Sequence, residues 1–254
     1  MKKIYKVVIV ILFMVFLVFT GIFVHLKFGT DASKKVMTNI ISEDNRNNSP
    51  NNTGKKNKKD FSKDIKEYDM LKKLKKINND AVAIINVKGT GIYYPVLQSK
   101  DNREYLRKNI NGNYDFNGSI FMDYECRFNK SDNVIIYGHN MESNNMFSEL
   151  VKYNNKNFFD SHRDIILYGK DKTINYKVVG VYNIDVTKES TYDFNVYINR
   201  DESTDALKYL QKLKPDLVFY DKSVSVDNNS KLLTLSTCTD TAGDFRTLVV
   251  AVQE

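Results

Sequence analysis

The chain has 254 residues, 42% of them hydrophobic, and its 38 Lys and Arg outnumber its 31 Asp and Glu, giving a net charge of +7. This composition excludes a wholly disordered chain, which has fewer apolar residues and a larger net charge. Two Cys residues exclude a disulfide-rich scaffold. The excess positive charge lies in residues 1–80, and the slightly acidic remainder argues against a nucleic-acid enzyme.

The N-terminus carries a long apolar run. After three lysines, residues 7–26 contain no acidic residue, Lys or Arg. About 20 apolar residues match the thickness of the bilayer hydrocarbon, and no small-residue cleavage site follows the run. The pattern predicts a cytoplasmic tail over residues 1–6 and a single-pass transmembrane signal anchor over residues 7–27, with the remainder on the extracellular face of the cell membrane. A cleaved signal peptide is the alternative interpretation.

A polar segment and a helix follow. Residues 28–60 are predicted to be a flexible polar stalk, because residues 44–60 lack apolar side chains that could pack. Apolar residues then recur every three or four positions over residues 61–77, which predicts an amphipathic helix. We expect this helix to open a catalytic domain over residues 61–254 and to pack on it. A helix on a membrane surface is the alternative, because lysines crowd its end.

The rest of the chain predicts a mainly β domain. Eight short runs have strand composition: residues 81–87, 92–96, 119–123, 134–137, 165–168, 176–182, 232–236 and 248–252. A clear helix is expected over residues 203–213, and short helices over residues 101–108 and 146–153. Eight short strands with few helices favour a closed barrel or a sandwich over a doubly wound sheet.

Three side chains at expected strand ends have the chemistry of acyl transfer. His139 ends a strand in the context YGHN, where Gly138 permits a sharp turn. Cys238 ends another strand in the context TLSTC, and Arg246 begins the next strand. A hairpin would bring Arg246 beside Cys238, where a guanidinium lowers the thiol pKa and can hold an oxyanion. A thiol, an imidazole and a guanidinium are what nucleophilic acyl transfer needs.

The remaining Cys and His residues have simpler interpretations. His25 lies in the apolar run, and His162 lies in a polar stretch typical of a solvated loop. Cys126 is interpreted as a bystander thiol, with a disulfide to Cys238 as the alternative that would remove the nucleophile. No spacing typical of metal ligands and no nucleotide-binding motif is present, so we expect no metal and no cofactor.

The motifs resemble those of a known family. TLSTC at residues 234–238 resembles the TLxTC signature of sortases, the cysteine transpeptidases of Gram-positive surfaces, and Arg246 and His139 stand at spacings that those enzymes use. The stretches YYPVLQSKDNREYL and GSIFMDYE, with the YGHN turn, are similar to class B sortases. The resemblance covers residues 61–254. It implies a mainly β fold, a closed eight-stranded sortase-type β-barrel with an N-terminal helix and a helix inserted between strands 6 and 7.

The resemblance also implies a reaction. Cys238 would attack the Thr carbonyl of a C-terminal sorting motif of the x-Pro-x-Thr-Asn or x-Pro-x-Thr-Gly type on a surface protein. An amine of a cell-wall peptidoglycan peptide would then resolve the thioacyl intermediate. His139 would shuttle protons, and Arg246 would brace the substrate carbonyls or the oxyanion. By motif position, the substrate groove is expected to include Tyr137, Ser236, Thr237, Asn102 and Leu106.

Two other functions are compatible with these features. A secreted cysteine peptidase would use the same residues for hydrolysis, and capture of the acyl group by an added amine distinguishes the two enzymes. A non-enzymatic β-barrel binding module would keep its function in Cys238→Ala. For the enzyme, free pKa values of about 8.5 for the thiol and about 6.5 for the imidazole make the thiolate–imidazolium pair a minority form. We therefore expect slow turnover and a bell-shaped pH profile.

Overall fold

The computed structural model describes residues 2–28, 31–47, 61–187, 197–201, 203–238 and 244–254. The chain divides after Asp31 into a small N-terminal unit and a large unit that begins at Ala32. The small unit contains helix α1 (Lys2–Phe28). The large unit contains the remaining described helices and the sheet.

Helix α1 covers the stretch in which the sequence predicts a transmembrane anchor. No helix in the described part of the chain is both long enough and apolar enough to cross a membrane. The prediction of a single-pass membrane anchor over residues 7–27, and the localisation derived from it, is therefore wrong on this finding.

Helix α2 (Ala32–Asn47) lies inside the segment that the sequence predicts to be a flexible stalk. Its Met37 and Ile40 are buried in one hydrophobic cluster with Leu71 of helix α3 (Phe61–Ile77). Two apolar side chains one turn apart are enough to hold a polar helix when another element covers them, because tertiary packing supplies most helical stability. The rest of the predicted stalk, residues 48–60, lies outside the described residues.

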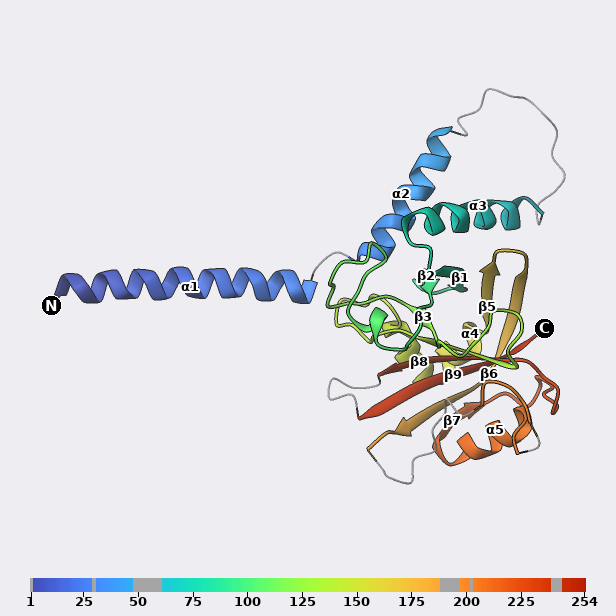
Figure 1. Cartoon of the computed structure of the whole chain (residues 1–254). Coiled ribbons are helices and arrows are strands. Elements are labelled where there is room, and N and C mark those ends of the chain that lie inside the picture. The colour runs from blue at the N-terminus through green and yellow to red at the C-terminus, as the bar shows by residue number, and fades with distance from the viewer. Residues whose placement is uncertain (1, 29–30, 48–60, 188–196, 202, 239–243) are drawn as a thin grey trace. The chain divides into compact units, whose positions relative to one another are not determined.

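Helix α3 packs on the strands β1 (Ala81–Val87) and β5 (Asp164–Gly169), as expected for a helix that opens the domain (Figure 1). Its Leu71 and Leu74 are fully buried. Ile77, which the periodicity places on the same apolar face, is 44% exposed because the helix ends there.

Eight strands form a closed barrel in the order β5-β1-β2-β3-β4-β8-β9-β6, and pairing between β5 and β6 closes the ring. The other strands of the barrel are β2 (Tyr93–Leu97), β3 (Phe121–Met122), β4 (Asn133–Tyr137), β6 (Thr173–Asp185), β8 (Leu232–Cys238) and β9 (Phe245–Gln253). A ninth strand, β7 (Leu217–Tyr220), pairs with β6 outside the barrel. The predicted closed eight-stranded barrel is confirmed, and all eight predicted strands are present.

The inserted helix lies where the resemblance places it, between the sixth and seventh strands of the barrel. Helix α5 (Ala206–Leu213) begins after Asp205, whose side chain caps it by accepting from the Lys208 N–H. Its buried face includes Tyr209, whereas Leu207 is 42% exposed. Strand β7 and helix α4 (Lys156–Ser161) are absent from the sequence prediction, because runs of four and six residues carry little periodicity.

Short 3₁₀ helices stand where the sequence predicts short helices. They are η1 (Glu104–Leu106) and η2 (Ser148–Asn154). A further 3₁₀ helix, η4 (Lys214–Asp216), follows α5 directly. The segment that leads from β2 through η1 to β3 contains Leu106, whose carbonyl oxygen contacts His139 just after β4, so this segment borders the site described below.

Candidate active site

Three neighbouring strands meet at one rim of the barrel. Strand β4 runs parallel to β8, with Tyr137 opposite Ser236, so both strands end at the same rim. Strand β9 runs antiparallel to β8 and begins there, with Arg246 directly opposite Cys238. The predicted hairpin therefore places Arg246 beside the Cys238 backbone. The Cys238 side chain lies outside the described residues.

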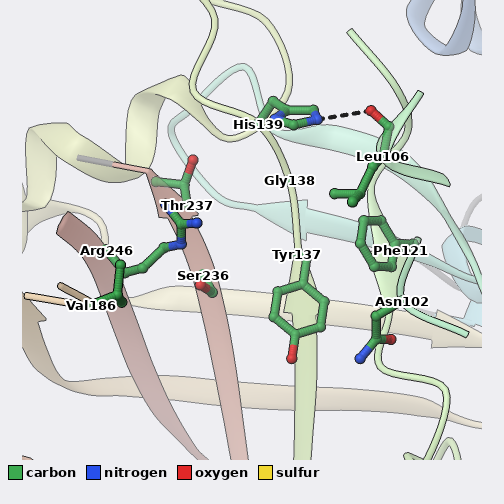
Figure 2. A pocket seen from close by; sticks show the side chains of 10 residues that line it. All are labelled: Asn102, Leu106, Phe121, Tyr137, Gly138, His139, Val186, Ser236, Thr237 and Arg246. Carbon is green, nitrogen blue, oxygen red and sulfur yellow. Dashed lines mark hydrogen bonds between the residues drawn. The ribbon is translucent and has the colours of Figure 1, made fainter. Parts of the chain in front are cut away.

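A cleft of about 360 Å³ opens at this rim (Figure 2). It gathers all the predicted site residues whose side chains are described, together with three that the sequence did not single out as binding residues. The lining residues are Asn102, Leu106, Phe121, Tyr137, Gly138, His139, Val186, Ser236, Thr237 and Arg246. They come from four strands (β3, β4, β8 and β9), from the residues that directly follow β4 and β6, and from the loop that contains η1. The residues expected to form the substrate groove thus lie around one hollow.

His139 follows β4 and is half-buried. Its Nε2 lies 2.9 Å from the main-chain oxygen of Leu106 (Figure 2). A carbonyl oxygen only accepts, so Nε2 carries a proton in both the neutral and the charged ring. In the neutral ring Nδ1 is then the unprotonated nitrogen, and it is the atom that gains and loses the proton.

The surroundings lower the pKa of His139. Burial is the main cause, because it disfavours the charged ring, and the positive charges of Arg107 and Arg246 act in the same direction. The hydrogen bond to the Leu106 carbonyl opposes them by favouring the imidazolium. At neutral pH the balance favours the neutral ring.

Gly138 has a different role from the one that the sequence predicts. It is not among the glycines with a positive φ, so the backbone at this point does not demand glycine for its conformation. A Cβ at Gly138 would instead lie 2.7 Å from the ring of the buried Phe147. The Phe147 N–H donates to the His139 carbonyl at 3.0 Å. Glycine therefore permits close packing of the chain behind the histidine.

The Leu106 carbonyl is held by close packing of its own loop. Gly118 has φ +61°, and a Cβ there would lie 2.6 Å from the carbonyl oxygens of both Leu106 and Tyr105. The Ser119 N–H donates to the Tyr105 carbonyl at 3.0 Å. The residue that orients His139 therefore has little room to move on the side of Gly118.

Arg246 and the last residues of β8 form the opposite wall of the cleft (Figure 2). Thr237 is 2% exposed, and its hydroxyl has no hydrogen-bond partner among the described residues. A buried hydroxyl without a partner costs about 1–3 kcal/mol. Thr237 therefore keeps an uncommitted hydroxyl in the cleft wall, one residue before Cys238.

Phe121 and Val186 line the cleft without having been predicted to do so. Phe121 packs its ring against Tyr137, with centroids 5.2 Å apart. It lies within GSIFMDYE, so the motif contained a signal for it. Val186 follows β6, and the Val186 N–H donates to the Asp244 carbonyl at 2.8 Å. No sequence motif marks Val186, because pairing of β6 with β9 brings it to the rim.

Cys126 is not suited to catalysis. It is a free, buried thiol, so it forms no disulfide with Cys238. Its sulfur accepts from the Ile135 N–H at 3.3 Å, and burial raises its pKa to about 12. In the described part of the chain, no group of three or more His, Cys, Asp or Glu residues is placed to hold a metal ion.

His162 makes more contacts than a solvated loop histidine would. Its ring stacks on Phe158 with a centroid separation of 3.8 Å, and its Nε2 lies 3.2 Å from the Gly89 carbonyl oxygen. It packs on helix α4, and it is not among the residues that line the cleft. These contacts indicate a structural role.

Comparisons with known proteins agree with this geometry. A family model described as the sortase domain matches residues 85–254. The chain is 42% identical over 180 residues to sortase B of Listeria monocytogenes, a match that covers 70% of each protein. The chain belongs to the sortase family. It is 32% identical over 180 residues to sortase B of Staphylococcus aureus, covering 70% of this chain and 71% of the relative.

Solved sortase B structures share the fold. A Clostridium perfringens sortase B structure matches with a TM-score of 0.65 and 34% identity, covering 72% of this chain and 98% of that one. A Staphylococcus aureus sortase B–substrate complex matches with a TM-score of 0.69 and 26% identity, covering 87% and 94%. The chain is thus a class B sortase, a cysteine transpeptidase that anchors proteins to the cell wall. Family membership excludes the non-enzymatic binding module.

Proposed function

We propose that this sortase cleaves a C-terminal sorting motif of the x-Pro-x-Thr-Asn or x-Pro-x-Thr-Gly type after Thr, with Cys238 as nucleophile. The observation that carries the proposal is the register of β8 and β9, which sets the Cys238 backbone opposite Arg246 at the rim of the cleft that His139 lines. The sortase B–substrate complex of Staphylococcus aureus, 26% identical in sequence to this chain, supports a substrate for an enzyme of this fold.

The first half of the reaction acylates the enzyme. The Cys238 thiolate attacks the Thr carbonyl carbon and forms a C–S bond, and the carbonyl electrons move onto oxygen. Arg246 stabilises that oxyanion through its guanidinium N–H groups. When the electrons return, the Thr C–N bond breaks, and the leaving amine takes the proton from Nδ1 of His139. The products are a thioester, a neutral imidazole and the released C-terminal peptide.

The second half transfers the acyl group. An amine of a peptidoglycan peptide loses a proton to Nδ1 of His139 as it attacks the thioester carbonyl. Arg246 again stabilises the oxyanion, and the C–S bond breaks to restore the thiolate–imidazolium pair. Nδ1 is the nitrogen that exchanges the proton in both half-reactions, because Nε2 keeps its own proton on the Leu106 carbonyl. Between the half-reactions Nδ1 is unprotonated and ready to accept the proton of the incoming amine. The net charge is unchanged in each half-reaction, and the thiolate and the imidazolium are both restored at the end of the second.

Quenched fluorescent peptides of the form x-Pro-x-Thr-x test the proposal on the full-length chain. They are incubated with and without oligoglycine or a diaminopimelate-containing amine, and the products are read by mass spectrometry. We expect cleavage after Thr, an amine adduct, and loss of both in Cys238→Ala. Cys126→Ala is the matched control and should keep both. Cleavage without any adduct would favour a cysteine peptidase, and activity in Cys238→Ala would overturn the assignment of the nucleophile.

A further inference from the structure

A buried carboxylate lies behind the polar end of the cleft. Asp123 follows β3 and is 2% exposed. Its Oδ2 accepts from Asn102 Nδ2 at 2.7 Å and from the Tyr137 hydroxyl at 2.8 Å. Both donors line the cleft, whereas Asp123 is not among the lining residues. The carboxylate therefore reaches the cleft through these two side chains.

The turn after β3 holds this carboxylate in place. Its Oδ1 accepts from the Glu125 N–H at 3.0 Å. The Asp123 N–H donates to the Ile135 carbonyl at 2.9 Å, and Gln98 Nε2 donates to the Asp123 carbonyl at 2.7 Å. Rotation of the Asp123 side chain would leave the half-buried donors of Asn102 and Tyr137 without this acceptor, which is unfavourable. The carboxylate is thus a fixed acceptor.

These hydrogen bonds determine which way the Asn102 amide points. An ionised carboxylate only accepts, so the amide nitrogen must face Asp123. The Tyr124 N–H donates to Asn102 Oδ1 at 3.0 Å, so the amide oxygen must face Tyr124. Both contacts assign the same amide orientation. The second hydrogen on Nδ2 is then the donor that Asn102 can offer to a bound molecule.

The same carboxylate sets the polarity of Tyr137. Its hydroxyl hydrogen goes to Asp123, so its oxygen can offer only lone pairs to a substrate. The Tyr137 ring packs against Phe121, which fixes its direction. Asn102 and Tyr137 lie together at one end of the cleft (Figure 2). In an extended peptide, the N–H and the C=O of one residue point to the same side of the strand. The Tyr137 oxygen can accept from such an N–H, and the Asn102 amide can donate to the C=O beside it.

We propose that Asp123 is a positioning residue for substrate binding. It holds Asn102 as a donor and Tyr137 as an acceptor, so that this end of the cleft pairs with the main chain of the sorting peptide. The inference rests on the proposed function, since it takes a sorting peptide as the occupant of the cleft. It predicts that Asp123 affects peptide binding and leaves the reactivity of Cys238 unchanged.

Asp123→Asn tests this role because it keeps the shape and replaces one acceptor oxygen with a donor. In the full-length chain we expect KM for the cleaved peptide to rise about tenfold, with kcat and the rate of Cys238 alkylation by iodoacetamide within about twofold of wild type. Asp132→Asn is the matched control, since Asp132 is 9% exposed, pairs with Arg200 and is not among the cleft-lining residues. It should leave KM unchanged.

A second measurement does not depend on the folding of Asp123→Asn. Sorting peptides in which one amide at a time is replaced by an ester lose a single main-chain N–H. With the wild-type enzyme, an ester at one position should raise KM about tenfold relative to the all-amide peptide. With Tyr137→Phe, KM should be the same for that ester peptide and for the all-amide peptide. An unchanged KM in Asp123→Asn, or an ester scan with no sensitive position, would overturn the role of Asp123 while the proposed function stands. A wild-type chain that neither binds nor cleaves any peptide would overturn both.

Discussion

The ring of His139 is joined to the main chain of Leu106 by a hydrogen bond of 2.9 Å between Nε2 and the carbonyl oxygen. Leu106 lies 33 positions earlier in the chain, in the loop that forms another wall of the cleft. The carbonyl fixes the tautomer and the direction of the imidazole at once. The geometry of the loop that contains η1 is therefore part of the proposed proton-transfer machinery, although that loop supplies no acid or base to it.

Gly118→Ala should disturb proton transfer through this loop. The new Cβ would lie 2.6 Å from the Leu106 carbonyl oxygen, so that carbonyl must move and His139 with it. We expect kcat to fall roughly 10- to 100-fold, the range that a small misplacement of a catalytic group can cost. Peptide cleavage assays measure the loss of kcat, and thermal unfolding of the same variant measures any loss of stability separately.

Gly112→Ala is the matched control for that variant. Gly112 also has a positive φ, +78°, but nothing lies within 4 Å of an added Cβ. The substitution should cost about 1 kcal/mol of folding free energy from backbone strain and leave kcat near wild type. Equal losses of kcat in both variants would contradict a specific role for the Leu106 carbonyl.

The pH profile should reflect the lowered pKa of His139. Because the folded pKa lies below the ordinary 6.5, the imidazolium is lost at a lower pH than in a free histidine. The acid limb of kcat/KM should therefore have its midpoint below pH 6.5. The fraction of molecules that hold the thiolate–imidazolium pair at pH 7 should also be smaller than the fraction expected from the pKa values of free cysteine and histidine. NMR titration of the His139 ring in full-length Cys238→Ala measures this pKa directly.

Arg107→Gln provides a control on the cause of that shift. It removes one of the positive charges that lower the pKa of His139, so the NMR midpoint and the acid limb should both move to higher pH. Because Arg107 is exposed, added salt should reduce the difference between variant and wild type. A midpoint above pH 7 in the wild type would contradict the effect of burial.

The two cysteines should differ in reactivity. The Cys126 thiol has its pKa raised to about 12 by burial and stays protonated at neutral pH, so iodoacetamide should label Cys238 alone in the folded protein. Cys126→Ala should cost about 1 kcal/mol of stability by leaving a small cavity and should keep the activity. Peptide mapping of the alkylated chain identifies which cysteine was labelled. Labelling of Cys126 in the folded protein would contradict this prediction, because it would mean that iodoacetamide reaches the buried thiol.

Arg246→Ala should reduce kcat by about 10²- to 10³-fold if its guanidinium holds the oxyanion. Arg246→Lys should recover little of that loss, because an ammonium cannot reproduce the planar fork of N–H donors. The comparison needs kcat and KM for the same peptide. Full recovery by lysine would mean that Arg246 contributes charge alone.

The sequence predicts the barrel well because its strands are short, apolar runs separated by clear breaks. It also places Cys238, His139 and Arg246 at strand ends, and the pairing of β4, β8 and β9 brings these positions to one rim. Their catalytic roles stay a prediction. Strand β7, with four residues, has too little pattern to identify. Helix α2 was missed because only tertiary packing, against β2 and against the hydrophobic cluster that includes Leu71 of α3, makes a polar segment with two buried apolar residues helical.

The contacts that tune the site are harder to read from the sequence. The hydrogen bond of His139 to Leu106 uses a main-chain oxygen, which has no residue identity. The clash that requires glycine at position 118 arises from how one loop folds back on itself. Asp123 lies in a motif that the sequence analysis quoted, but its role depends on Asn102 and Tyr137 lying on either side of it.

The parallel pairing of β4 with β8 has a consequence for how activity arises during folding. His139 and Cys238 lie on adjacent strands, yet β5, β6, α5 and β7 all intervene between them in the chain. A nascent or truncated chain that has completed β4 alone holds the imidazole without its thiol. Long-range pairings of this kind form late and raise the contact order. Gain of activity on refolding should therefore coincide with closure of the barrel, with no active fragment along the way.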